Sequence, residues 1–160
     1  MAGKKRLRGQ LMKQLMTEWR NFLLEGNVEH AGILMIKPDP AIIAQAQEMQ
    51  TTLPESGVPL EDKDLHVTLI HQSILNPFKE QLENINLPDP PSVEIESRVF
   101  QRKSPGKESW AVRLTNQDEM KDYVKQVMEL LGSPNTNPEP ERVFHITLGN
   151  LTGNPHDSVR

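Results

Sequence analysis

The sequence predicts an α+β fold built from two similar βαβ-type halves, and three observations lead to this prediction. One four-residue word, a histidine followed by a β-branched residue, Thr and Leu, occurs as HVTL at 66–69 and again as HITL at 145–148. Each copy closes a run of strand, helix, Pro-rich loop and strand. The run spans 35 residues from Ala31 to the first histidine and 34 from Ala111 to the second. Matching order, spacing and wording indicate an internal duplication.

The N-terminal part predicts a helix, a strand and a second helix. Residues 7–23 place Leu, Trp and Phe at helical spacing on one stripe. The apolar run 30–38, closed by proline, predicts a buried strand. Asp39 followed by Pro40 is typical of an N-cap with proline at the first helical position, so the next helix should run to about residue 51.

The rest of the first half predicts a strand and a helix between turn-rich segments. Residues 52–64 are rich in turn formers, and the short β-branched run 65–71 predicts a strand. A second Asn-Pro cap signal predicts a helix over about 76–84. The segment LPDPPS at 87–92 is the best internal boundary.

The second half predicts a hairpin, a helix and a last strand. Residues 93–101 alternate apolar and polar side chains, as in a half-exposed strand. Residues 102–109 predict a hairpin loop that leads into a paired strand at 110–115. A helix over 117–131 ends at a glycine, and a Pro-rich loop then leads to a strand at 142–150.

Composition narrows the class of protein. The chain has 160 residues, which suits one domain, and it has no cysteine, so disulfides, thiolate nucleophiles and Cys-type zinc sites are excluded. It contains no run of 18 apolar residues and no signal-peptide pattern, so we expect no membrane contact and a cytoplasmic location.

Charge is distributed unevenly along the chain. The net charge is −4, but residues 1–20 carry +5 and the remainder −9. An acidic body argues against tracking a long nucleic-acid backbone and still permits a small nucleotide held by a few groups. The basic N-terminal helix could be a solvated face, contact a polyanion, or pack on the domain, on a partner or on a second copy of the chain.

The repeated word can supply paired acid–base chemistry. Strand alternation puts His66 and Thr68 on one face and His145 and Thr147 on one face, with the apolar residues behind them. If the two strands are neighbours, the four side chains converge on one concave surface. One neutral histidine could then accept a proton while a protonated one donates a proton to a leaving oxygen, and the hydroxyls could hold a phosphate. No metal-binding motif accompanies them, so we expect no metal or cofactor.

Several other residues have two possible roles. Trp110 is either a base-stacking platform beside the cleft or a core residue. By strand parity, His71 and Arg142 should face away from the paired histidines. Arg113 and Lys103 are candidate phosphate-side charges.

The pair of motifs resembles the signature of the 2H phosphoesterase superfamily, which carries two His-x-[Thr/Ser]-apolar motifs. The resemblance covers about residues 30–150, and His66, Thr68, His145 and Thr147 match it position for position. It implies a bilobal α+β domain with antiparallel strands lining a central cleft. It also implies a metal-independent phosphodiesterase whose catalytic histidines are His66 and His145.

The resemblance leaves the substrate open. Candidates are RNA ends with a 2′,3′-cyclic phosphate, 2′-5′ oligoadenylate and cyclic oligonucleotide signals. The ending FHITLGNLTGNPHDSV is similar to that of short phage-encoded members, which would imply countering a host immune signal in the host cytoplasm. A non-catalytic module that binds nucleotides or RNA ends, and a structural phage protein, remain alternatives.

The domain prediction follows from the same resemblance. We expect a basic amphipathic helix at 1–28 and one bilobal domain at 29–160, with halves of about 29–87 and 92–150. Only 15 residues follow His145, whereas the first half continues with a helix and a strand. The second half should therefore be abbreviated, completed by the N-terminal helix, or truncated.

Overall fold

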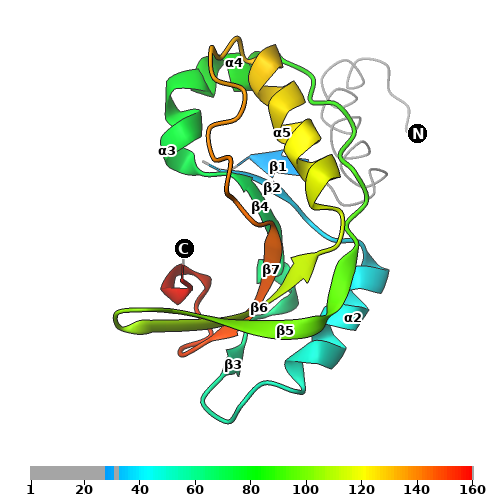
Figure 1. The fold of residues 1–160 in the computed structure, drawn as a ribbon, viewed down its shortest axis with the longest axis vertical. Coiled ribbons are helices and arrows are strands. Elements are labelled where there is room, and N and C mark those ends of the chain that lie inside the picture. The colour runs from blue at the N-terminus through cyan, green and yellow to red at the C-terminus, as the bar shows by residue number, and fades with distance from the viewer. Residues whose placement is uncertain (1–27, 31–32, 160) are drawn as a thin grey trace, which may run out of the picture.

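The computed structural model describes residues 28–30 and 33–159, so the helix expected at 7–23 lies outside the described residues. Its centre is an antiparallel sheet, which confirms the α+β class (Figure 1). The strands, in their order across the sheet, are β1 (Val28–His30), β2 (Leu34–Ile36), β4 (Val67–Ile70), β7 (His145–Asn150), β6 (Lys107–Leu114) and β5 (Ile95–Ser104). A short strand, β3 (Val58–Pro59), pairs with β7.

The helices begin where cap chemistry favours them. The Asp39 side chain accepts a hydrogen bond from the Ile42 amide at 2.9 Å and caps α2 (Pro40–Gln50), as expected. The helix expected at 76–84 is instead a 3₁₀ turn (Asn76–Phe78) followed by α4 (Lys79–Asn84), and a short helix that was not expected, α3 (Gln72–Leu75), precedes them. Pro77 lies in the 3₁₀ turn, and a residue without an N–H interrupts the α-helical ladder.

The β5–β6 hairpin is longer than its composition suggests. The expected loop at 102–109 is mostly strand, because pairing continues to Ser104 opposite Lys107. Only Pro105 and Gly106 form the turn, and Gly106 takes φ 77°, which proline-glycine turns of this kind require. Polar side chains on both faces hid these strands from a reading based on apolar alternation.

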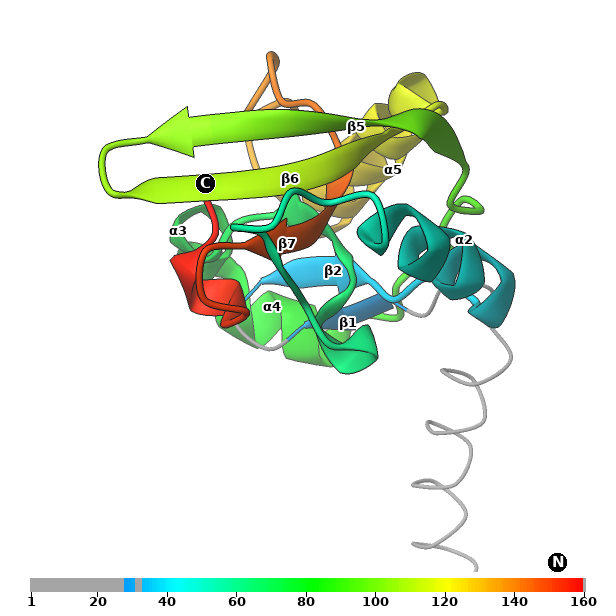
Figure 2. The same cartoon turned by 90° about the horizontal axis from the view of Figure 1, so that it is seen from below.

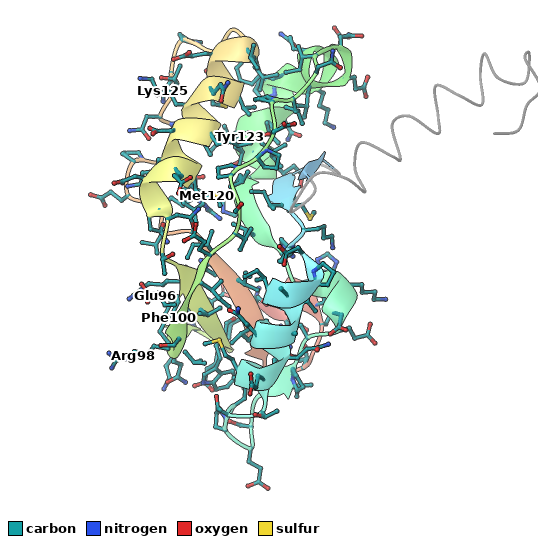
Figure 3. The ribbon with its side chains drawn as sticks, turned by 90° about the vertical axis from the view of Figure 1, so that its right-hand side faces the viewer. Glu96, Arg98, Phe100, Met120, Tyr123 and Lys125 are labelled. Carbon is teal, nitrogen blue, oxygen red and sulfur yellow. The ribbon has the colours of Figure 1, made fainter. Side chains whose placement is uncertain are left out.

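Two helices cover one face of the sheet. α2 contacts β7 and β5, whereas α5 (Gln117–Leu130) contacts β4, so each helix lies behind strands from the other half of the chain. Figure 3 shows Met120 and Tyr123 on the side of α5 toward the sheet and Lys125 on its outer side. Side chains of both halves form one hydrophobic core. The opposite face of the sheet is not covered by α2 or α5 (Figure 1).

The described residues after β7 are held by hydrogen bonds. They form a loop and a 3₁₀ turn (Pro155–Asp157) beside the β5–β6 hairpin (Figure 2). The buried Asn150 side chain accepts hydrogen bonds from the amides of Thr152 and Gly153 and donates to the Asn154 carbonyl. The second half is therefore followed by a compact loop where the first half has α3 and α4.

No helix among the described residues is long and apolar enough to cross a membrane.

Candidate active site

The register of β4 and β7 brings the two repeated words together. Val67 pairs with Ile146 in an antiparallel ladder, and both side chains are fully buried. One step to either side of this pair, each histidine comes to lie beside the threonine of the other strand. The four side chains share the face opposite the core and line one cleft: His66, Thr68, His145 and Thr147.

The cleft is large and open to one side. Its volume is about 1540 Å³, which exceeds the roughly 300–1,000 Å³ of ordinary small-ligand pockets. Its walls are α3, the loop at 139–143, the β5–β6 hairpin and the C-terminal turn. The helices α2 and α5 lie on the other face of the sheet (Figure 1). The quartet therefore occupies the floor of a cleft that has room for more than one nucleotide.

Cationic side chains concentrate in this cleft although the chain as a whole is acidic. Its walls include five basic residues, Lys37, Lys63, Arg102, Arg113 and Arg142. Three carboxylates, Asp64, Glu139 and Glu141, face the same space. Such a concave basic surface focuses its field and attracts anions.

The ring of His66 is oriented by a main-chain carbonyl just before β4. Its Nδ1 lies 2.7 Å from the carbonyl oxygen of Asp64. A carbonyl only accepts, so Nδ1 carries a proton and Nε2 is the nitrogen available for proton transfer. Nε2 lies 3.1 Å from the hydroxyl of Thr68, on the cleft side of the strand.

His145 is oriented in the same way. Its Nδ1 lies 3.0 Å from the carbonyl of Val143, again two residues earlier in the chain. Its Nε2 lies 3.1 Å from Nη1 of Arg102. A guanidinium only donates, so Nε2 is unprotonated here and the ring is neutral.

The surroundings of His145 disfavour its charged form. The pKa of His145 is lowered to about 4, mainly by burial; the Val143 carbonyl raises it, and the positive charges of Arg102 and Arg142 and the nearby His66 add to the lowering. A histidine with this pKa is neutral at physiological pH and can act as a proton acceptor.

This lowered pKa predicts a pH-dependent stability. The unfolded chain binds a proton at His145 near the ordinary pKa of about 6.5, whereas the folded chain does so near 4. Between these values the unfolded state binds more protons, so the free energy of unfolding should fall as pH falls from about 6.5 to 4, by up to about 3 kcal/mol from this residue.

Urea unfolding of the wild type and of His145→Gln at pH 7.5 and 4.5 measures this contribution. The wild type should lose about 2–3 kcal/mol more than the variant between the two pH values. Equal losses in the two proteins would contradict the partly buried, neutral state of His145.

Arg142 and His71 lie in this cleft, contrary to the expectation from strand parity. Arg142 donates through Nη1 to Nε2 of His71 and through Nη2 to the Thr68 carbonyl at 3.0 Å. β4 ends before His71 and β7 begins after Arg142, so strand alternation does not extend to either residue. Strand parity placed this pair on the wrong face, although a histidine two residues after one motif and an arginine three residues before the other were a usable signal.

Of the remaining candidate residues, one is in the core, one is on the surface and one lines the cleft. Trp110 is only 6% exposed and does not line the cleft. Its ring packs against Gly57, where an added Cβ would lie 3.3 Å from the Cε3 atom of Trp110. Trp110 is therefore a core residue rather than a stacking platform. Lys103 is exposed and pairs with Glu108 at 3.4 Å. Arg113 lines the cleft with its guanidinium 4.4 Å from the ring centroid of Phe100.

Arg102 is a further residue that sequence reasoning missed. It lies in the segment expected to be a hairpin loop, and it reaches His145 across β6, the strand between their two strands. No spacing in the sequence shows that a residue on β5 and one on β7 will meet.

Within the part of the chain that the structure describes, no group of three His, Asp or Glu side chains is placed to hold a metal ion. We compared the chain with protein-family models, with curated proteins and with solved structures, and none of the three comparisons found a match.

Proposed function

We propose that the protein is a 2H-type phosphodiesterase that cleaves a nucleotide phosphodiester by two-histidine acid–base catalysis without a metal ion. One observation carries the proposal. His66 and His145 lie on neighbouring strands of one cleft, each with Nδ1 on a main-chain carbonyl and Nε2 on the cleft side. A cross-strand threonine beside each ring supplies a hydroxyl for the same substrate.

We also propose that this chain has the duplicated arrangement of the superfamily, with two similar half-sites around one centre. Arg113 pairs with His145 across β6 and β7. On the other side, Ile36 pairs with Val67, and one further step puts Lys37 beside His66. Each histidine thus has a threonine on one neighbouring strand and a cation on the other, an approximate two-fold relation that supports two half-sites of one centre.

The geometry favours particular roles for the two histidines. Nε2 of His145 is the unprotonated nitrogen of a neutral ring, so we assign it as the base that takes a proton from the attacking hydroxyl once the Arg102 contact is released. The new oxygen–phosphorus bond forms as the bond to the leaving oxygen breaks. His66, as imidazolium, gives its Nε2 proton to that oxygen. The Asp64 and Val143 carbonyls stabilise whichever ring is charged.

Charge and space support an anionic substrate of nucleotide size or larger. Basic side chains around the quartet offset the charge that develops on the non-bridging oxygens, and the threonine hydroxyls can donate to them. The cleft admits RNA ends with a 2′,3′-cyclic phosphate, 2′-5′ oligoadenylate and cyclic oligonucleotides.

A substrate panel tests this function. The protein is incubated in EDTA with 2′,3′-cyclic AMP, 2′-5′ oligoadenylate and cyclic dinucleotides, and products are separated by chromatography. We expect turnover of at least one substrate, unchanged by EDTA. Turnover that EDTA abolishes would contradict the two-histidine mechanism, and binding of the panel without turnover would favour a non-catalytic nucleotide-binding module.

A further inference from the structure

Arg102 connects the candidate base to the C-terminal segment. Its Nη1 lies 3.1 Å from Nε2 of His145 and 3.3 Å from the carbonyl oxygen of Val159. Arg102 pairs with Ser109 across the hairpin, and the Ser109 hydroxyl accepts a hydrogen bond from the Val159 amide at 2.7 Å. Val159 is therefore held through both its amide and its carbonyl, and Arg102 donates to Val159 and His145 from the same nitrogen.

This contact blocks the nitrogen that the mechanism needs. A guanidinium N–H that donates to Nε2 occupies its electron pair, so His145 cannot accept a substrate proton at the same time. Both acceptors of Arg102 are neutral, and within the described residues Arg102 makes no ion pair. A charged phosphoryl oxygen is a stronger acceptor than an imidazole or a peptide carbonyl. An anion in the cleft should therefore draw Arg102 away from His145.

The other charged groups near His145 are arranged differently. Arg113, on β6, lies over Phe100, whose ring meets His145 edge-on with centroids 6.1 Å apart. Arg142, in the preceding loop, is engaged with His71 and with a β4 carbonyl. His66 approaches from β4. Among these groups, Arg102 alone donates to Nε2 of His145.

We propose that Arg102 is an anion-responsive cap on His145: it occupies Nε2 while the cleft is empty and moves to a phosphoryl oxygen when an anionic substrate enters, which frees Nε2 to accept a proton. The identity of that anion as a substrate phosphate rests on the proposed function. Arg102 would then be a positioning residue that couples substrate entry to the basicity of His145.

Long-range ¹H–¹⁵N spectra of the histidine rings in the ¹⁵N-labelled full chain test the cap. The probe is inorganic sulfate, a tetrahedral oxyanion, with chloride at equal ionic strength as the reference. In chloride, His145 of the wild type should titrate near its pKa of about 4. Sulfate should raise that midpoint by at least about one pH unit, because the guanidinium leaves and an anion arrives.

Three variants make the test specific. Arg102→Gln should start with a higher midpoint in chloride and respond less to sulfate. Arg102→Lys keeps the charge on a shorter side chain that reaches Nε2 of His145 less well, so it should start higher and keep the sulfate response; it carries the test if the glutamine variant does not fold. Arg98→Gln is the matched control, because Arg98 is an exposed arginine on the same strand outside the cleft lining (Figure 3), and it should behave as wild type.

The outcomes separate this inference from the proposed function. A His145 midpoint that sulfate does not move, or that is the same in Arg102→Gln and wild type, would overturn the cap even if phosphodiesters are cleaved. A midpoint that responds as expected in a protein that cleaves no member of the panel would leave the cap standing and overturn the proposed function.

Discussion

Replacing either His66 or His145 with glutamine is expected to lower kcat for phosphodiester cleavage by about 10²–10⁴-fold, since general acid–base catalysis contributes about that much per group. Glutamine retains a polar side chain of similar reach but cannot exchange a proton at neutral pH. The loss should fall mainly on kcat, because the threonines and arginines that would hold the phosphate remain. Steady-state rates on the best substrate of the panel, measured in EDTA, give the result.

The control for this pair is His156→Gln. His156 lies on the cleft wall but is exposed, and its position in the C-terminal turn gives it no part in the proposed proton transfers. This variant should keep the wild-type rate within a few fold. Full activity in either His66→Gln or His145→Gln would remove that histidine from the mechanism.

Leu148→Ala is expected to destabilise the protein by about 2–5 kcal/mol. Leu148 is fully buried on β7, where it belongs to the core that both halves of the chain share. Its carbonyl accepts from the Gln50 side chain and from the Leu60 amide, and these bonds involve only the main chain of Leu148, so the substitution reports on the lost side-chain packing. The free energy of unfolding, from urea titration, measures the effect.

Leu151→Ala is the matched control, three residues further along and 39% exposed. It should change the free energy of unfolding by no more than about 0.5 kcal/mol. Similar small effects at both positions would mean that β7 does not lie at the centre of the core.

The paired motifs could be found from the sequence because strand alternation is a local rule. Within β4 and β7 that rule correctly put the apolar partners in the core and the histidines and threonines on the other face. The cap of α2 at Asp39 was predictable for the same reason, since it depends on neighbouring residues.

The rule failed where the strands end. His71 is the N-cap of α3, directly after β4, and Arg142 lies in the irregular segment before β7, and both side chains line the cleft. The contact of Arg102 with His145 depends on how β5, β6 and β7 align and on the position of Val159, which only the tertiary structure determines. Trp110 was undecided from the sequence because its environment includes Gly57, more than fifty residues earlier.

The double variant His66→Gln/His145→Gln tests most directly whether the two repeated words form one catalytic centre. Groups that act in the same step are strongly non-additive, so removing both costs about as much as removing one. We predict that kcat of the double variant lies within about tenfold of the slower single variant. Losses that multiply, with the double variant slower by the product of the two single effects, would contradict a shared site.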